Sequence, residues 1–140
     1  MAVEALLKYL WASPASALGC LLALAAAPFG ARIGLRTGVL EVTLAREASE
    51  GRAVRRSLPF VAITLGHVVI AVSESDQARL RAHERVHVAQ YERWGPLFLV
   101  AYPVESLLQL LLGRRPYRDN RFEVEARRLA VGRTPGTRLQ

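Results

Sequence analysis

Cysteine is almost absent from this chain, because Cys20 is the only one among 140 residues. A single thiol cannot form an intrachain disulfide, and it excludes a zinc site built from four cysteines. The length allows one domain with a modest core. A bound metal ion or a lipid surface would add useful stability to such a core.

Lysine is equally scarce, since only Lys8 among the 19 basic residues is a lysine, and the formal net charge is +7. An excess of arginine favours acidic partners such as anionic lipid headgroups. The arginines are spread along the chain without a zinc knuckle, an aromatic-spaced RNA-binding signature or a glycine-rich phosphate loop. The composition therefore argues against nucleic acid and leaves membrane lipid as an expected partner.

Charge is missing altogether between Tyr9 and Gly30. This run is close to the length that crosses a bilayer, and it predicts a membrane-anchor helix over residues 1–32. A helix that is buried or lies on the membrane surface, and a cleaved signal peptide, are the alternatives. If the run spans, the positive-inside rule places the rest of the chain on the cytoplasmic side, because most of the arginines follow the run while only Lys8 precedes it.

The remaining residues, 33–140, are expected to form a single α+β domain with a small sheet. Alternation of apolar and polar side chains over 38–44 predicts a half-buried strand. The polar, basic stretch 46–57 indicates a loop. Residues 59–72 are rich in β-branched side chains and predict either a covered strand or a tight hairpin that turns near Gly66 and His67.

Three helices are expected in the second half of the chain. Ser73 to Asp76 form a capping box that starts the first helix, and Gly95-Pro96 ends it. The apolar stretch 97–113 predicts a second helix, at the membrane or packed over the site, and residues 120–131 predict the last one. The second helix has one narrow polar stripe at helical spacing, made of Tyr102, Glu105, Ser106 and Gln109.

The first of these helices contains the sequence His83-Glu84-Arg85-Val86-His87. Two histidines four residues apart project from one face of a helix, so both imidazoles can bind one metal ion. Zinc lowers the pKa of a bound water, and Glu84 is near enough to act as general base when that water attacks a carbonyl. The alternative is an arginine-rich amphipathic helix whose histidines face solvent or pack. The pattern favours a catalytic metal site of the zincin type.

A catalytic zinc needs a third protein ligand. His67 lies upstream, where packing or hydrogen bonding is the more common role, so a carboxylate downstream is the better candidate. Here the sequence resembles the gluzincins, in which a second helix donates a glutamate. Membrane-bound prenyl-protein and heat-shock-type zinc proteases of this kind carry Glu, two residues, then Ala-Asp, and Glu123 with Ala126 matches the Glu and the Ala. The resemblance implies Glu123 as the third ligand, with Glu125 as the second candidate.

The chain departs from that pattern at Arg127, which stands where those families have an aspartate that supports a ligand histidine. Asp119 is one candidate to replace it, and Gln90 is a candidate to hydrogen-bond within the site. Arg85 is a second departure, because the corresponding position in zincin helices is usually uncharged. These departures leave open whether the site turns over substrate.

The chain as a whole resembles a group of small uncharacterised membrane-associated bacterial proteins that carry this motif. The resemblance implies a minimal gluzincin-like fold at the bacterial inner membrane. We expect a membrane-associated zinc metallopeptidase that hydrolyses peptide bonds in a peptide or protein substrate. The alternatives are a catalytically inactive, metal-stabilised membrane protein that binds partners or lipid, and a metal-free basic protein at the membrane surface.

Overall fold

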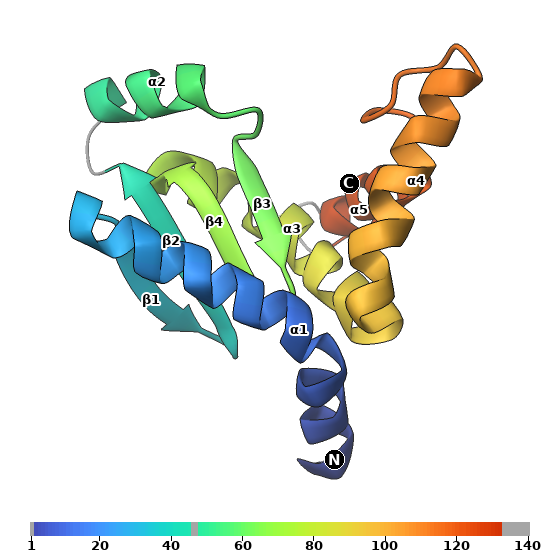
Figure 1. The fold of residues 1–140 in the computed structure, drawn as a ribbon, viewed down its shortest axis with the longest axis horizontal. Helices are drawn as coiled ribbons and strands as arrows, with labels where there is room; N and C mark the ends of the chain where they lie inside the picture. The colour runs from blue at the N-terminus through green and yellow to red at the C-terminus, as the bar shows by residue number, and fades with distance from the viewer. Residues whose placement is uncertain (1, 46–47, 133–140) are drawn as a thin grey trace, which may run out of the picture.

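A computed structural model describes residues 2–45 and 48–132, which form an α+β fold as expected, with an apolar helix at the N-terminus (Figure 1). A four-stranded sheet occupies the centre. The elements follow one another as α1 (Ala2–Ala26), β1 (Arg32–Arg36), β2 (Val39–Ala45), α2 (Ala48–Ser57), β3 (Ala62–Leu65), β4 (Val68–Ser73), α3 (Glu74–Trp94), α4 (Phe98–Leu111) and α5 (Arg121–Val131). Short 3-10 turns at Ala27–Phe29 and Gly95–Leu97 follow α1 and α3.

The sheet is mixed, with the order β1-β2-β4-β3. The outer pairs are antiparallel hairpins, whereas β2 and β4 in the middle are parallel. The β3–β4 hairpin confirms the turn predicted near Gly66 and His67. Gly66 has a φ of 62°, and a Cβ atom there would lie 2.6 Å from the backbone nitrogen of Ser16 in α1. Glycine is therefore required both by the left-handed backbone and by the close approach of α1.

Both faces of the sheet are covered, so the expectation that β2 is half-buried is wrong. Val42 packs with Ala23 of α1 on one face. Val39 packs with Val88 of α3 on the other face. Apolar and polar side chains alternate along β2 as predicted. The polar side chains lie on the face toward α3 and are covered by it, since Glu41 pairs with Arg81 of α3 at 3.0 Å.

Two elements were not anticipated from the sequence. The loop expected over residues 46–57 is wrong for 48–57, which form α2, while 46 and 47 lie outside the described residues. Contacts distant in sequence hold α2, since Arg55 pairs with Asp76 at 2.5 Å. Strand β1 was missed because all of its side chains are exposed, and it is held by its pairing with β2 rather than by burial.

Helix α1 lies on the sheet through its smallest side chains. Its buried residues are Ala12, Ala15, Gly19 and Ala23. These residues recur at helical spacing and let the backbone of α1 approach β4 closely. The stretch Ala2–Phe29, like Glu74–Leu111, is long and apolar enough to cross a membrane, which by itself is weak evidence that it does so.

Gly19 provides a direct test of this packing. A Cβ atom at Gly19 would lie 2.6 Å from the Cβ of Val68, so Gly19→Leu is expected to push α1 off the sheet. We expect a loss of about 1–3 kcal/mol in the free energy of unfolding, as for other overpacked cores. The matched control is Ala17→Leu on the exposed side of the same helix, which is expected to unfold like the parent protein. Chemical unfolding in mild detergent, followed by circular dichroism, measures both; equal stabilities would contradict the packing described.

Candidate metal centre

The histidine motif lies in the middle of α3, whose ends are fixed as the sequence predicts. Ser73 caps the start of the helix, because its Oγ accepts a hydrogen bond from the backbone nitrogen of Asp76 at 3.2 Å. Gly95 ends it with a φ of 58°. With both ends settled, His83 and His87 fall on successive turns of one face, and the side chain of His87 is buried.

Helix α5 brings a glutamate back to this face. Its N-cap is Asn120, whose Oδ1 accepts a hydrogen bond from the backbone of Phe122 at 2.9 Å. The amide of Asn120 also donates to the Ser106 hydroxyl in α4 at 2.8 Å, and Asn120 is fully buried. This cap fixes both where α5 begins and how it docks on α4. One turn later, Glu123 points its carboxylate at the two histidines, with 2% of the residue exposed.

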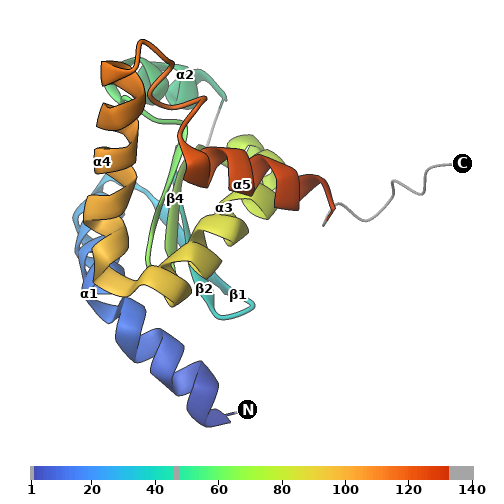
Figure 2. The same ribbon diagram turned by 90° about the vertical axis from the view of Figure 1, so that its right-hand side faces the viewer.

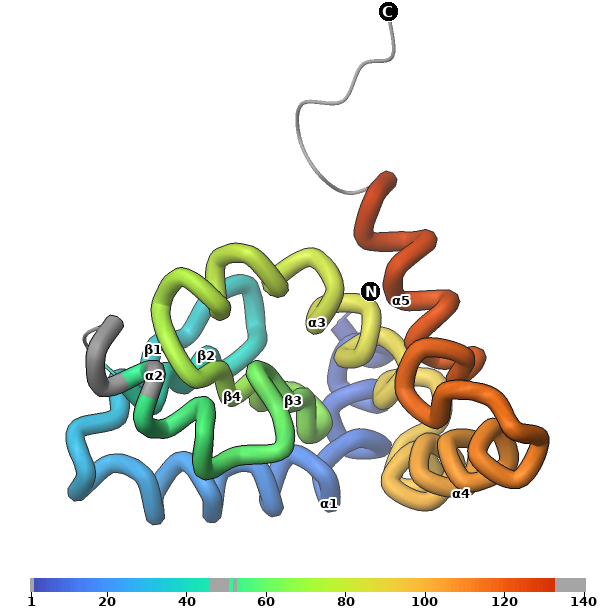
Figure 3. The backbone as a smooth tube through the Cα atoms, turned by 90° about the horizontal axis from the view of Figure 1, so that it is seen from above, coloured from blue at the N-terminus to red at the C-terminus, as the bar shows by residue number. Residues whose placement is uncertain are grey.

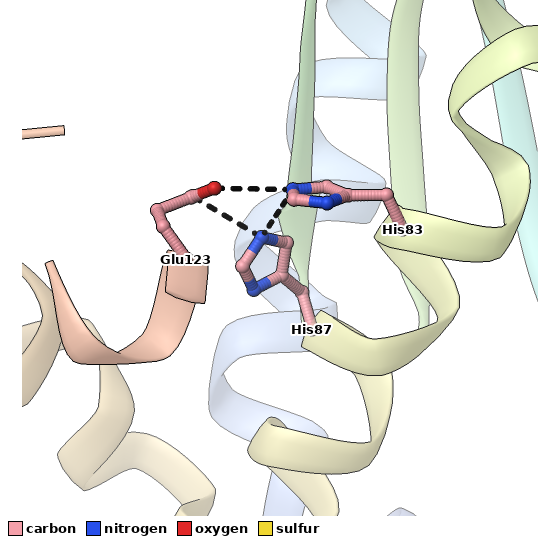
Figure 4. Close-up of side chains that lie close together, drawn as sticks. All are labelled: His83, His87 and Glu123. Carbon is pink, nitrogen blue, oxygen red and sulfur yellow. Dashed lines mark hydrogen bonds and ion pairs between the residues drawn. The ribbon is translucent and has the colours of Figure 1, made fainter. Parts of the chain in front are cut away.

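His83, His87 and Glu123 converge from α3 and α5, and their side chains point toward one another in Figure 4. The two Nε2 atoms lie 3.1 Å apart. One carboxylate oxygen of Glu123 is 3.1 Å from Nε2 of His83, and the other is 3.2 Å from Nε2 of His87. One ligand atom from each residue lies within 4.8 Å of the others. This buried group can hold a metal ion.

The spacing of the donor atoms is compatible with a bound metal ion. Zinc ligands at about 2.0–2.1 Å in tetrahedral geometry are separated from one another by roughly 3.3 Å. The separation of the two Nε2 atoms, 3.1 Å, is close to that value, and a different oxygen of Glu123 approaches each imidazole, at 3.1 and 3.2 Å. In addition, Oε2 of Glu123 is buried with Nε2 of His83 at 3.1 Å, and a cation between the two would satisfy both atoms.

Electrostatics make the group attractive to positive charge. Burial by itself raises the pKa of Glu123, but the two imidazoles and the Tyr102 hydroxyl outweigh it and hold the pKa far below its usual range. Burial lowers the pKa of His87, whereas the carboxylates of Glu123 and Glu84 outweigh it and raise that pKa. Glu123 is therefore ionised at neutral pH. Without a metal the group attracts protons, and a metal ion competes with them for the same atoms.

Gln90 determines which nitrogen of His87 is free to bind a metal. The amide nitrogen of Gln90 donates to the carbonyl of Phe122 at 3.1 Å and to Glu125 at 2.7 Å. Its oxygen must therefore face Nδ1 of His87, 2.8 Å away, and accept the proton there. In the neutral imidazole, Nε2 of His87 therefore carries the lone pair, directed at the shared site. Gln90 is therefore hydrogen-bonded within the candidate site, as the sequence suggests.

Removing this support is expected to weaken metal binding without removing a ligand. Loss of such a hydrogen bond typically lowers metal affinity by about 10-fold to 100-fold, and we expect a loss in that range for Gln90→Ala. The matched control is Gln77→Ala, a buried glutamine near the start of the same helix, which is expected to leave the affinity unchanged. Competition with a chromogenic zinc chelator measures both. An unchanged affinity in Gln90→Ala would contradict the assigned role.

Glu125 does not join the metal group. Its carboxylate accepts hydrogen bonds from Gln90 at 2.7 Å and from Arg93 at 3.2 Å. The hydrogen bond from Gln90 and the charge of Arg93 outweigh burial and lower its pKa. Residues 123 and 125 face different sides of α5, as the sequence predicts. Glu125 therefore supports His87 through Gln90 instead of competing with Glu123.

The two departures from the gluzincin pattern lie away from the metal group. Arg127 donates to the backbone carbonyl of Arg118, and Asp119 accepts from the backbone of Arg115 at 2.8 Å. Neither residue is hydrogen-bonded to a ligand histidine. Arg85 donates to the backbone carbonyl of Thr37 at 3.2 Å, in the turn between β1 and β2. Its charge thus anchors α3 to the sheet.

His67, the histidine upstream of the motif, contacts other residues. Its Nε2 lies 3.1 Å from the carboxylate of Glu92, and its ring stacks on Tyr9 of α1 with the centroids 4.0 Å apart. It is not part of the metal-binding group among the described residues. The structure therefore agrees with the packed, hydrogen-bonded role for this histidine.

An apolar cleft of about 620 Å³ adjoins the metal-binding group. His87, Glu123 and Glu84 line it, together with residues from β3, α4 and the segment before β3. The carboxylate of Glu84 is buried, and its Oε2 accepts a hydrogen bond from the Thr64 hydroxyl of β3 at 2.7 Å. The candidate base thus lies in the wall of the cleft beside a ligand histidine.

Sequence reasoning missed two residues that build this site. Asn120 was included in the last helix, although an asparagine before an apolar, helical stretch is a known capping signal. Thr64 carried no usable signal, because its contact with Glu84 depends on how β3 packs against α3. Both residues act by placing a functional carboxylate rather than by supplying one.

Comparisons of the chain with models of known protein families, with curated proteins and with solved structures found no match. The site itself is the evidence for a function. Its elements are the three converging ligand residues, the buried carboxylate of Glu84 and the adjoining cleft.

Proposed function

We propose that this chain is a zinc metallopeptidase that works at a membrane. The observation that carries the proposal is the convergence of His83, His87 and Glu123, with the carboxylate of Glu84 beside them in the same cleft. Two imidazoles and one carboxylate suit zinc well, and three protein ligands leave a fourth position for water or substrate. We place it at the bacterial inner membrane on the cytoplasmic side, where anionic lipid headgroups attract its excess of arginine.

Zinc held by these residues would supply a Lewis acid that acidifies water and polarises a peptide carbonyl. Glu84 is then the general base. It accepts the proton of the attacking water and passes it to the nitrogen of the leaving amine. Thr64 holds one oxygen of Glu84 at 2.7 Å and so fixes the direction in which the carboxylate approaches the water.

An extended peptide fits the cleft beside β3. The register pairs Thr64 with Val69 and Ala62 with Ala71, as non-hydrogen-bonded pairs of the hairpin. The backbone groups of Ala62 and Thr64 therefore point away from β4, toward the free edge of the sheet. A substrate strand can pair with this edge, and the apolar lining accommodates apolar side chains.

A phenol group in the cleft is available to stabilise the oxyanion that forms when the carbonyl is attacked. Burial and the charge of Glu123 raise the pKa of Tyr117 to about 12, so it stays a hydrogen-bond donor at neutral pH. Tyr117 lines the cleft together with Glu84 and Glu123. Tyr102 is the second candidate for this role, and both hydroxyls also interact with Glu123.

The activity is tested with zinc-loaded protein in mild detergent and an unfolded protein such as casein as substrate. We expect cleavage on the amino side or carboxyl side of apolar residues, detected by mass spectrometry of the products. A zinc chelator should abolish the cleavage, and added zinc should restore it. Intact substrate after incubation with zinc-loaded protein, across a mixed peptide library, would contradict the proposed activity.

A further inference from the structure

Helix α4 turns its polar side chains toward the protein and its apolar side chains outward, the reverse of a helix on a water-soluble protein. Its polar side chains face the protein, where Glu105 accepts a hydrogen bond from the backbone nitrogen of Arg121 at 3.4 Å and Ser106 accepts one from Asn120 at 2.8 Å. Its opposite side consists of exposed apolar residues, each at least 47% exposed, namely Val100, Val104, Leu107, Leu108 and Leu111. A helix that faces water has its polar side outward and its apolar side toward the protein. A surrounding of hydrocarbon explains this orientation.

Helix α1 has a similar outer side. While its small residues pack on the sheet, the residues opposite them are large and apolar, and Leu21 and Leu24 are 64% and 67% exposed. Phe29, just after the helix, is 88% exposed. Single exposed leucines are ordinary, but an uncharged surface along two helices marks an interaction site.

The two outer sides belong to one face of the molecule. Seen from above in Figure 3, the later half of α1 and the whole of α4 lie along the same edge, with α3 and α5 on the opposite side. The view in Figure 2 agrees, because α4 and the later half of α1 both lie on the left there. We call this surface, made of the exposed apolar residues of the later half of α1 and of α4, the apolar face.

We infer that the apolar face is embedded in one leaflet of a lipid bilayer, with the later half of α1 and α4 lying parallel to the membrane plane. The inference rests on the membrane association proposed above and is independent of peptidase activity. Arg114, Arg115 and Arg118 follow α4 directly and are exposed, as expected of residues that bind anionic headgroups. Two copies of a chain with net charge +7 repel one another, so charge favours lipid over a second copy.

The lengths and contacts of α4 and α1 favour helices that lie in the membrane plane over helices that cross the bilayer. The 14 residues of α4 extend over only about 21 Å, whereas the hydrocarbon core of a bilayer is about 30 Å thick. Helix α1 is longer, but its inner side is bound to the sheet over several turns. If α1 crossed the bilayer, β1 with Arg32 and Arg36 would be carried to membrane depth, which is costly for charged residues.

This arrangement places the cleft at the membrane surface. Helix α4 contributes Leu99 and Tyr102 to the cleft wall and Val100 and Val104 to the apolar face. Because a helix with its side chains is about 10–12 Å in diameter, the cleft lies within roughly one helix diameter of the lipid. The peptides that reach it are therefore segments that lie at the membrane surface.

Spin labels measure this arrangement directly. In a Cys20→Ser background, single cysteines are introduced at Ala17 and Leu24 of α1 and at Val104 and Leu107 of α4, and the labelled protein is bound to vesicles of phosphatidylcholine and phosphatidylglycerol. We expect all four labels at similar depths, roughly 5–10 Å below the headgroup boundary. The control is Leu129→Cys on α5, where the residue is 50% exposed and the label is expected to stay in water.

Three results would overturn the inference. A depth difference of about 10 Å between positions 17 and 24 would mean that α1 crosses the bilayer. Labels on α1 and α4 that remain in water would show that the apolar face does not enter lipid. Labels that lie close to the same label of another copy would assign the apolar face to a contact between copies. As a second measurement, Leu107→Glu is expected to lower vesicle binding at least about ten-fold, whereas Leu129→Glu on α5 leaves it unchanged. Equal binding of the two variants would also count against it.

Discussion

Glu84→Gln is expected to retain zinc and the parent fold while losing proteolysis almost completely. Glutamine preserves the size of the side chain and can still contact the Thr64 hydroxyl, but it cannot accept a proton from water. General base catalysis contributes about 10²–10⁴-fold, so we expect kcat to fall by at least that factor. The comparison needs the zinc content, the thermal unfolding temperature and the casein cleavage rate of both proteins.

The same experiment separates the enzyme from a metal-stabilised protein without activity. If the metal only supports the fold, neither the parent protein nor Glu84→Gln cleaves peptides, and the two contain equal zinc. The matched control is Glu92→Gln, which changes another glutamate of α3, one paired with His67 and not in the cleft. Full activity in Glu84→Gln would exclude Glu84 as the base.

His83→Ala and Glu123→Ala are expected to lose stoichiometric zinc. Removal of a residue that merely supports a ligand typically lowers affinity by about 10-fold to 100-fold, so loss of a ligand itself is expected to exceed 100-fold. Because metal affinity adds to folding stability, zinc should raise the unfolding temperature of the parent protein and have little effect on either variant. Elemental analysis after dialysis and unfolding with and without zinc measure these effects.

The neighbouring residues provide the controls for this prediction. Glu125→Ala is expected to retain one zinc with weakened affinity, because Glu125 acts only through Gln90. His67→Ala is expected to retain zinc with full affinity, since His67 contacts Glu92 and Tyr9. Stoichiometric zinc in Glu123→Ala, with loss in Glu125→Ala, would transfer the third ligand to Glu125.

The features of the site that depend on neighbouring residues in the chain could be predicted from the sequence. Four-residue spacing on a helix places His83 and His87 on one face, and the caps at Ser73 and Gly95 define that helix. The third ligand required a resemblance, because no local rule brings Glu123 back to α3. The structure places Glu123 next to both histidines.

The parts that depend on tertiary contacts could not be predicted. Gln90 adopts its orientation only because α5 presents the carbonyl of Phe122 and the carboxylate of Glu125 to it. The helix α2 forms from a polar stretch whose contacts, such as Arg55 with Asp76, join residues distant in sequence. Helix α1 was equally ambiguous, because an apolar run looks alike whether it packs on a sheet, lies in a leaflet or crosses a bilayer.

The measurement closest to the central claim is X-ray absorption at the zinc K-edge of the purified, zinc-loaded protein. If His83, His87 and Glu123 share one ion, the spectrum should show a tetrahedral site with two imidazoles and oxygen ligands, all at about 2.0–2.1 Å. A sulfur ligand at about 2.3 Å, which only Cys20 or Met1 could supply, would contradict the assignment. A zinc ion surrounded by oxygen alone, without imidazole, would contradict it as well.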